Sequence, residues 1–252
     1  MTLRIDLNAD IGESFGAWRM GQDAAVLPQV SSVNIACGFH AGDPMTMHAT
    51  VRAAVAQGVA IGAHPALPDL QGFGRREMRI TPEEAYALVV YQTGALAGFA
   101  AAAGSRLAHV KPHGALYTMA ARDAALADAI ATAVRDVDRR LILVGLAGSE
   151  LTRAAGRAGV PAASEVFADR RYEADGTLTP RSHPDAVIHD LDIAIVQVIA
   201  LATRGEVAAR TGERLRLAAD TICLHGDRAD AGEAARRIRQ ALLEAGVTVA
   251  SP

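Results

Sequence analysis

Short apolar runs of strand length alternate along this chain with segments of helical patterning. Local signals mark two helix starts: Asp43 precedes Pro44 in a segment that Gly58 ends, and the Thr81–Glu84 segment forms a capping box. Strands that alternate with helices of about 10–20 residues form βαβ units, and therefore a parallel sheet. The strand-like runs are Leu3–Leu7, Val33–Ala36, Val59–Ala63, Leu107–Val110, Leu141–Leu146, Ala162–Phe167 and Thr221–Leu224.

Length and composition agree with one α/β unit. A chain of 252 residues is close to the size of a single α/β barrel, which is about 200–250 residues, so we expect one domain over residues 1–252. The net charge of −3 lacks the basic excess of a dedicated nucleic-acid-binding protein, and no apolar run reaches the roughly 18 residues of a membrane span. We therefore expect a cytoplasmic protein with no nucleic-acid or membrane partner.

Further helical patterns occupy the segments between the later strand-like runs. One connection, from Asp169 to about Pro184, is long for a compact α/β chain and contains the turn dipeptide Asp175-Gly176. We expect this connection to form a small hairpin or a lid. The additional helices are expected at Asp123–Val137, Ser149–Ala158, Asp190–Thr203 and Asp230–Ala245.

Each strand-like run ends in a cluster of polar residues. The carboxyl ends of the strands of a parallel barrel all face the same way, and barrel enzymes place their chemistry there. A doubly wound sheet would gather strand ends only near its switch point. Seven such clusters therefore favour a barrel with a single active-site mouth. The clusters are residues 6–13, 34–43, 62–65, 109–114, 148–150, 165–170 and 225–227.

The first run carries polar residues on one face. Asp6, Asn8 and Asp10 alternate with apolar residues, so all three project to the same side of the strand. Polar groups on a buried strand need hydrogen-bond partners or a ligand. A closed hydrogen-bond network in the barrel core is one interpretation. We favour a functional role for Asp10, which lies nearest the end of the strand.

The fourth run contains the one lysine among the 25 basic residues of the chain. His109, Lys111 and His113 share a strand face, and Pro112 favours an extended conformation at Lys111. A lysine beside imidazoles suits anion binding or proton transfer. We expect His109, deeper in the strand, to be structural, and Lys111 and His113 to act in catalysis.

His40 and His64 end the second and third runs. Together with Asp10 they could form a metal site of two histidines and a carboxylate on three strands. Their spacing matches no local ligand motif, and two histidines can equally serve as hydrogen-bond donors or proton shuttles. We therefore expect catalytic roles for both and leave a bound divalent metal open.

Arginines and a histidine–aspartate pair stand in other loops at the strand ends. Arg76 and Arg170 suit a carboxylate or a phosphate, although ordinary surface charge is the alternative. His225 and Asp227 could pair with each other or contact substrate. Neither GxxxxGK[ST] nor GxGxxG is present, and Cys37 and Cys223 have no clear neighbouring base, so they are expected to be small buried residues.

Taken together, these motifs are similar to those of a known family. The segments Asp6–Gly16, Asn34–Asp43 and Lys111–Tyr117 resemble the LamB/YcsF family, the A subunits of prokaryotic 5-oxoprolinase. Shorter matches run in the same order along the chain, so the resemblance spans residues 5 to about 231. The shorter segments are Gly62–Pro65, Gly72–Arg76, Phe167–Arg170 and His225–Asp227.

The resemblance implies a fold, a reaction and partners. The fold would be a distorted seven-stranded β/α barrel of the glycoside hydrolase/deacetylase type. The reaction would be ATP-dependent opening of 5-oxo-L-proline to L-glutamate, with magnesium-bound ATP as co-substrate and with separate B and C subunits as partners. The expected substrate-binding side chains at the matching positions are Asn8, Glu13, Asn34, Arg76, Arg170, His225 and Asp227.

Two alternatives remain open at this point. A metal-dependent deacetylase or amidohydrolase would hold a stoichiometric metal and need no ATP. A non-catalytic subunit that binds 5-oxoproline would tolerate substitution of Asp10 and Lys111.

Overall fold

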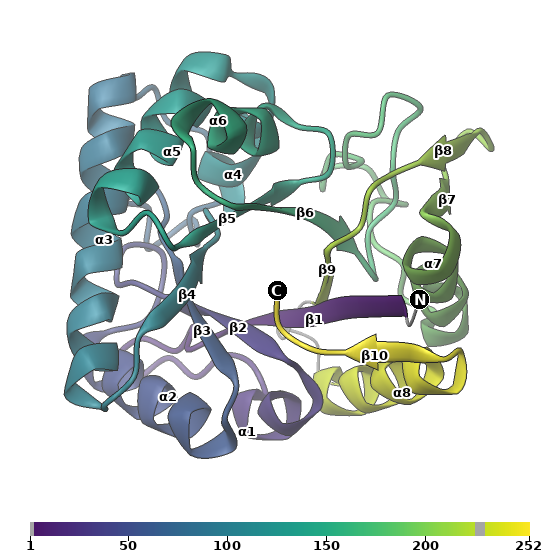
Figure 1. Cartoon of the computed structure of the whole chain (residues 1–252), viewed down its shortest axis with the longest axis horizontal. Helices are drawn as coiled ribbons and strands as arrows, with labels where there is room; N and C mark the ends of the chain where they lie inside the picture. Colours follow the sequence, from purple (N-terminus) through teal and green to yellow (C-terminus); the bar gives the residue numbers. More distant parts are fainter. Residues whose placement is uncertain (1–2, 225–229) are drawn as a thin grey trace.

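The chain forms a closed barrel of seven parallel strands, which confirms the predicted fold class (Figure 1). The computed structural model describes residues 3–224 and 230–252. Strand β1 pairs with β2 on one side and with β9 on the other, and this double pairing closes the barrel. The strands are β1 (Leu3–Ile11), β2 (Ser32–Ala36), β3 (Ala60–His64), β4 (Leu107–Val110), β5 (Ile142–Leu146), β6 (Ala162–Phe167) and β9 (Thr221–Leu224).

Helices cover the outside of the barrel, and the apolar core lies between the two layers (Figure 1). The predicted caps are present: the Asp43 side chain accepts from two amides of α2, Gly58 ends that helix in the left-handed conformation, and Thr81 forms its capping box with Glu84. The predicted helices are α2 (Pro44–Gln57), α3 (Pro82–Ala102), α5 (Ala124–Val137), α6 (Glu150–Ala158), α7 (Leu191–Arg204) and α8 (Ala231–Glu244).

Several short elements were not predicted. Strand β10 pairs with the start of β1, and β7 and β8 form a small antiparallel ribbon. Elements of three or four residues are too short to display a hydrophobic period, and α4 begins inside a motif that has the pattern of a loop. The additional elements are α1 (Asp23–Val26), η1 (Leu27–Gln29), α4 (Gly114–Arg122), β7 (Glu206–Ala208), β8 (Arg214–Arg216) and β10 (Val247–Val249).

Helix α3 is the one helix in the described parts of the chain that is long and apolar enough, by length and composition alone, to cross a membrane. Its 21 residues nevertheless pack against α5 and β3. The buried side-chain amide of Gln92 accepts a hydrogen bond from the backbone N–H of Ala66 and donates one to the Ala66 carbonyl oxygen. We therefore describe α3 as part of the outer helical layer.

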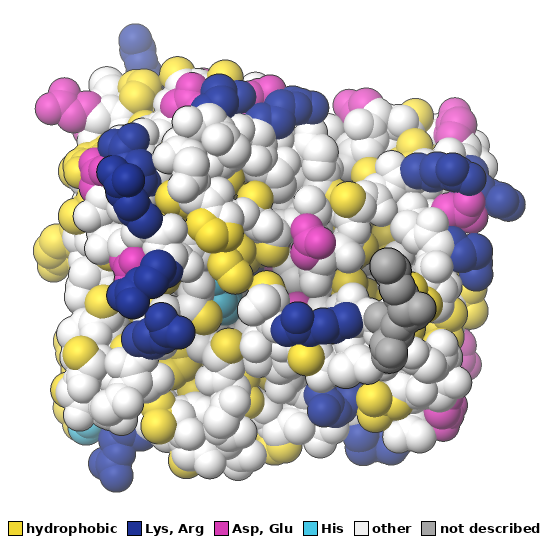
Figure 2. Space-filling view, in the orientation of Figure 1, with side chains coloured by type: hydrophobic (Ala, Val, Ile, Leu, Met, Phe, Trp, Pro, Cys, Tyr) yellow, Lys and Arg dark blue, Asp and Glu magenta, His cyan; other side chains and the backbone are white. Residues whose placement is uncertain are grey.

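Figure 2 shows acidic and basic side chains interspersed over one face of the molecule.

The interior of the barrel is polar at the positions that strand alternation predicted. Asp6 accepts hydrogen bonds from the hydroxyls of Ser31, Ser32 and Thr221, so the lowest layer is a closed network. Burial raises the pKa of Asp6, although these hydroxyl bonds oppose the shift. For Asp6, the hydrogen-bond interpretation therefore accounts for the buried carboxyl.

A glycine makes room for a histidine in this interior. A Cβ added at Gly62 on β3 would lie 2.0 Å from Nε2 of His109 on β4. His109 is buried, and that same nitrogen lies 2.7 Å from Oδ1 of Asn34. The absence of a side chain at position 62 thus leaves room for the His109 imidazole to reach Asn34 and hold the next polar layer of the barrel in place.

The connection between β6 and α7 folds back over the barrel mouth. Bridges between Tyr172 and Leu178 and between Arg170 and Val187 give it the shape of a small irregular hairpin, as predicted. The Arg170 guanidinium donates to the carbonyls of Thr179 and Ala186 and holds the two sides of the segment together. The connection therefore forms part of the wall of the site.

Candidate active site

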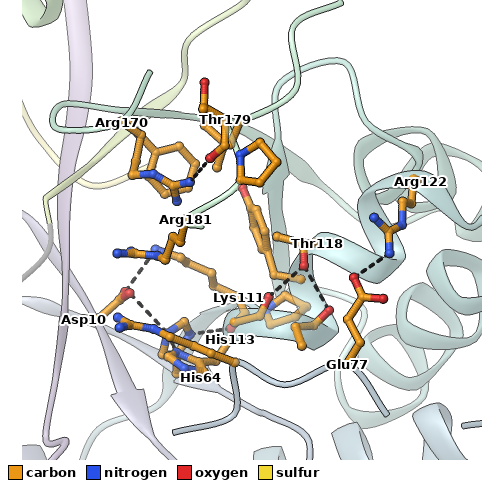
Figure 3. Close-up of a pocket in the computed structure, with 18 of the residues that line it drawn as sticks. Asp10, His64, Glu77, Lys111, His113, Thr118, Arg122, Arg170, Thr179 and Arg181 are labelled. Carbon is orange, nitrogen blue, oxygen red and sulfur yellow. Dashed lines mark hydrogen bonds and ion pairs between the residues drawn. The ribbon is translucent and has the colours of Figure 1, made fainter. Parts of the chain in front are cut away.

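A cavity of about 370 Å³ opens at the carboxyl ends of the barrel strands (Figure 3). This volume falls within the usual range of small-molecule sites, about 300–1,000 Å³. Loops after β1, β3, β4 and β6 contribute to its walls. Its lining residues include Asp10, Glu13, His64, Arg75, Glu77, Lys111, His113, Tyr117, Thr118, Arg122, Phe167, Arg170, Leu178, Thr179, Pro180 and Arg181.

Lys111 lies at the cavity between two carboxylates from other strands. Its Nζ is 3.0 Å from Oδ1 of Asp10 and 2.8 Å from Oε1 of Glu165. Burial by itself lowers the pKa of Lys111, but the adjacent carboxylates outweigh it and hold the pKa well above its ordinary value. The ammonium is therefore charged at neutral pH and suits stabilisation of negative charge better than removal of a proton.

Glu165 connects this lysine to a buried tyrosine. Tyr117 on α4 donates its hydroxyl hydrogen to Oε2 of Glu165 at 2.8 Å, while Asn8 donates to Oε1 at 3.2 Å. Glu165 is fully buried. All of these contacts fix the direction in which Lys111 points.

Asn8 and Asn34 lie beneath the cavity in the layer of His109. The Asn34 amide donates to Oδ1 of Asn8 at 2.8 Å and to Oδ1 of Asp10 at 2.7 Å. Neither asparagine is among the residues that line the cavity. The structure therefore places both predicted substrate contacts where they orient Asp10 and Lys111.

Three histidines and a glutamate meet beside Lys111. One ligand atom from each of Glu13, His40, His64 and His113 lies within 4.8 Å of the others, and all four residues are buried. Asp10, which the sequence grouped with His40 and His64, stands next to this cluster, with Oδ2 at 3.3 Å from Nε2 of His64. The set that the structure brings together differs from the predicted one: it keeps His40 and His64, has Glu13 and His113 in place of Asp10, and is suited to a metal ion.

Burial keeps two of these imidazoles neutral. It lowers the pKa of His40 and of His113 well below the ordinary histidine value, and the neighbouring imidazoles add to the shift. The rings of His40 and His113 stack in parallel with their centroids 3.8 Å apart. Their uncharged nitrogens are available as hydrogen-bond acceptors or metal ligands at neutral pH.

Arginines surround the outer part of the cavity. Arg75, Arg122, Arg170 and Arg181 all line it, and Arg122 pairs with Glu77 (Figure 3). Burial lowers the pKa of Arg170 to about 10, with Arg181 contributing, and Arg170 still carries its charge at neutral pH. The cavity therefore presents several guanidinium groups that suit a carboxylate or phosphate.

Arg76 is not among the residues of the cavity wall. It pairs instead with Asp69 in the loop after β3, and its side chain is 64% exposed. Its neighbour Arg75 lines the cavity. Gly114 holds this loop close, because its φ is +54° and an added Cβ would lie 2.5 Å from the carbonyl oxygen of Gly74. For the predicted arginine contact, Arg75 is thus the residue in position.

The predicted histidine–aspartate pair and the two cysteines have different outcomes. His225 and Asp227 lie outside the described residues. Cys37 and Cys223 are free and buried, as expected, and burial raises the pKa of both thiols. The sequence prediction did not include Glu165, Tyr117 or Arg122, and among the arginines of these loops it selected Arg76 and Arg170 rather than Arg75 and Arg181. Glu165, Tyr117 and Arg75 stood within segments already noted for their motifs.

Proteins with high sequence identity over nearly the full chain have a common name. A Bordetella pertussis protein named as the A subunit of 5-oxoprolinase is 64% identical over 249 residues, covering 99% of this chain and 99% of that protein. A Bacillus subtilis protein of the same name is 58% identical over 246 residues, covering 98% and 96%.

Solved structures agree with the fold. A crystal structure of a lactam utilization protein from Thermus thermophilus has a TM-score of 0.94 and 48% identity, and the match covers 99% of this chain and 100% of that chain. The T48 deacetylase with substrate has a TM-score of 0.52 at 15% identity, covering 98% and 87%. The second similarity shows that the two proteins share a barrel fold and concerns the fold alone.

The family profile extends over almost all of the chain. It covers residues 5–252, and therefore every strand-end cluster that surrounds the cavity. Together with the full-length relatives above 55% identity, this match shows that the chain belongs to the LamB/YcsF family.

Proposed function

We propose that this protein is the A subunit of a 5-oxoprolinase, which acts in the cytoplasm and opens the lactam of 5-oxo-L-proline to give L-glutamate. The proposal rests first on relatives of that name at 58–64% identity. The T. thermophilus structure, described as a lactam utilization protein, supports the same substrate class. The alternative of a metal-dependent deacetylase has the fold similarity and the cluster of Glu13 and three histidines in its favour, but the relatives of high identity bear the 5-oxoprolinase name.

One observation in the cavity carries the proposal: a charged lysine and several arginines line the same cavity. 5-Oxoproline is small, and it carries a carboxylate and a lactam carbonyl. An arginine of the wall, Arg75 or Arg181, would hold the carboxylate, while Lys111 would lie near the lactam oxygen. Positioned positive charge stabilises an oxygen that becomes negative during the reaction.

The need for ATP follows from the stability of a five-membered lactam. In the proposed sequence, the γ-phosphoryl group passes from ATP to the lactam oxygen, and ADP leaves. Water then adds to the activated carbon, the ring C–N bond breaks, and the nitrogen takes up a proton to become the amine of glutamyl phosphate. A second water hydrolyses this anhydride to glutamate and phosphate, so that each turnover consumes one ATP and two waters.

We assign to Asp10 the role of directing the attacking water. It lines the cavity beside Lys111 and His64, whereas both ring nitrogens of the other candidate, His113, already have neighbours in His64 and the carbonyl of Phe73. Asp10 is already oriented by Lys111 and Asn34 through its Oδ1 atom, so its Oδ2 atom faces the histidine cluster. A carboxylate held in this way can accept a proton from water within hydrogen-bond reach.

The relatives are named as one subunit of an enzyme, which supports the existence of partner subunits, and we propose that these are the B and C subunits. The test is to measure ADP and glutamate formed from 5-oxo-L-proline with this chain alone, with B and C alone, and with all three. We expect coupled formation of both products only with all three. ATP-independent hydrolysis by the chain alone would contradict the proposal, as would full turnover by B and C without it.

A further inference from the structure

The tautomers of neutral His64 and His113 can be assigned from their backbone contacts. Nδ1 of His64 lies 2.6 Å from the carbonyl oxygen of Lys111, and Nε2 of His113 lies 2.8 Å from the carbonyl oxygen of Phe73. A carbonyl oxygen only accepts hydrogen bonds, so each of these nitrogens carries a hydrogen and donates it. In a neutral imidazole the other nitrogen then has a lone pair and no hydrogen.

These assignments leave two lone pairs facing each other. Nε2 of His64 and Nδ1 of His113 are only 3.0 Å apart. Carboxylate oxygens add further electron pairs, with Asp10 Oδ2 at 3.3 Å from Nε2 of His64 and Glu13 Oε1 at 3.8 Å from Nδ1 of His113. Acceptors at such distances repel one another unless a proton or a metal cation lies between them.

His40 faces the same point. Its Nε2 lies 3.4 Å from Oε1 of Glu13, yet neither ring nitrogen has a hydrogen-bond partner anywhere in residues 3–224 and 230–252. The side chain is buried, and a buried polar atom without a partner is costly. A metal cation would satisfy Nε2 of His40, Nε2 of His64 and Nδ1 of His113 together, whereas a single proton bridges at most two of them.

We propose that Glu13, His40, His64 and His113 bind one divalent transition-metal ion through three imidazole nitrogens and one carboxylate oxygen. Ligands around a tetrahedral zinc-like ion at about 2.0–2.1 Å stand roughly 3.3 Å from each other. Three of the separations in this cluster, 3.0, 3.4 and 3.8 Å, are close to that spacing, and all four ligand atoms lie within 4.8 Å of one another. Three imidazoles select ions such as zinc, iron or nickel over magnesium and calcium, which prefer oxygen ligands.

The surroundings resemble those of a built metal site. Metal-binding histidines commonly donate their second ring hydrogen to a backbone carbonyl or carboxylate, as His64 and His113 do here. Glu13, His64 and His113 line the cavity, so the site is accessible from it. When bound there, a divalent ion supplies a Lewis acid that polarises a carbonyl oxygen. The inference depends on the four side chains and does not require the proposed function.

The test uses the full chain, stripped of metal with a chelator and dialysed. Zinc is titrated by calorimetry, and cobalt(II) is followed by its visible absorption, which reports coordination. We expect one equivalent of either ion. His40→Ala and His113→Ala should each weaken binding on the order of 100-fold or more, since loss of even a supporting contact costs about 10–100-fold. His48→Ala, in helix α2 and outside the cluster, is the matched control and should bind as the wild type does.

A second measurement guards against misfolded variants. Glu13→Gln keeps the size of the side chain and should retain the fold by circular dichroism while weakening zinc binding at least tenfold. Zinc should raise the Tm of the wild type and of His48→Ala but leave that of His40→Ala unchanged. Failure of the wild type to bind either ion, or equal binding by folded His40→Ala, would overturn the inference. Neither result depends on turnover, so the proposed function is tested separately.

Discussion

Lys111, directly after β4, and Glu165 on β6 form an ion pair of 2.8 Å across the inside of the barrel, although 54 positions separate them in the chain. Strand β5 lies between their two strands in the sheet. Both side chains are almost completely buried. The pairing fixes the one lysine of the chain at the base of a cavity whose walls carry arginines.

The hydroxyl of Tyr117 is expected to contribute to stability through Glu165. Tyr117→Phe removes the donor at 2.8 Å and leaves a fully buried carboxylate oxygen with one bond fewer. We expect the free energy of unfolding in urea to fall by about 1–3 kcal/mol. Tyr91→Phe is the control: its side chain is exposed, so a change within about 0.5 kcal/mol is expected. Equal effects of the two substitutions would contradict this role.

Arg75 and Arg76 are neighbours in sequence but should differ in their effect on substrate binding. Arg75→Gln removes a guanidinium from the cavity wall, and we expect the KM for 5-oxo-L-proline to rise about tenfold, which corresponds to about 1.4 kcal/mol. Arg76→Gln removes a partner of Asp69 outside the cavity and should leave KM within about twofold. Steady-state kinetics with the B and C subunits present measures both. A larger rise for Arg76→Gln would show that the loop is differently placed.

A methyl group at position 62 should destabilise the barrel. In Gly62→Ala the new Cβ would meet the His109 ring at 2.0–2.4 Å, and the ring is buried and held by the contact of its Nε2 atom with Asn34. We expect a loss of roughly 1–3 kcal/mol or more in urea unfolding. Gly94→Ala, in the exposed part of α3 with no atom within 4 Å of the added Cβ, should be neutral or stabilising by up to about 1 kcal/mol. A tolerated Gly62→Ala would contradict the close contact.

Acid should weaken the fold through His109. Burial, with Lys111 adding to it, lowers the pKa of His109 to about 3, whereas an unfolded histidine titrates near 6.5. Between these values the unfolded chain binds more protons, so stability rises with pH across this window and is lost as pH falls. The stability gap between the wild type and His109→Gln should therefore narrow by about 1.4 kcal/mol per pH unit below pH 6.5. Parallel urea-unfolding profiles from pH 7 to pH 5 would exclude this contribution.

Features with local causes could be predicted from the sequence. Capping at Asp43 and Thr81 involves residues within one helical turn, so the starts of α2 and α3 were readable without any tertiary information. Strand alternation likewise placed Asp6, Asn8 and Asp10 on one face, and the fold turns that face into the barrel. The predicted seven-stranded barrel follows from the same local patterns.

Features that depend on register between distant strands were not predictable. No local pattern indicates that Glu165 faces Lys111, or that Glu13 and His113 join His40 and His64 in one cluster while Asp10 stands beside it. The choice between Arg75 and Arg76 is also set by tertiary contacts, because a loop has no regular period from which the direction of each side chain can be predicted. The three-residue strand β10 required its pairing with β1 to be recognised.

Removal of the lysine tests the proposed chemistry most directly. In Lys111→Met, Asp10 and Glu165 lose their cation, which can destabilise a buried cluster by about 3–5 kcal/mol. The double variant Lys111→Met/Glu165→Gln removes part of that excess charge, so folding can be verified in at least one of the two. Arg140→Met, on the surface, is the control and should keep wild-type turnover.

The decisive quantity is the rate of glutamate formation from 5-oxo-L-proline and ATP by the folded variant with the B and C subunits. We predict a kcat at least about 100-fold below that of the wild type, because the charge at the lactam oxygen is lost. A folded Lys111 variant with kcat within about twofold of the wild type would contradict a role for this lysine in the reaction.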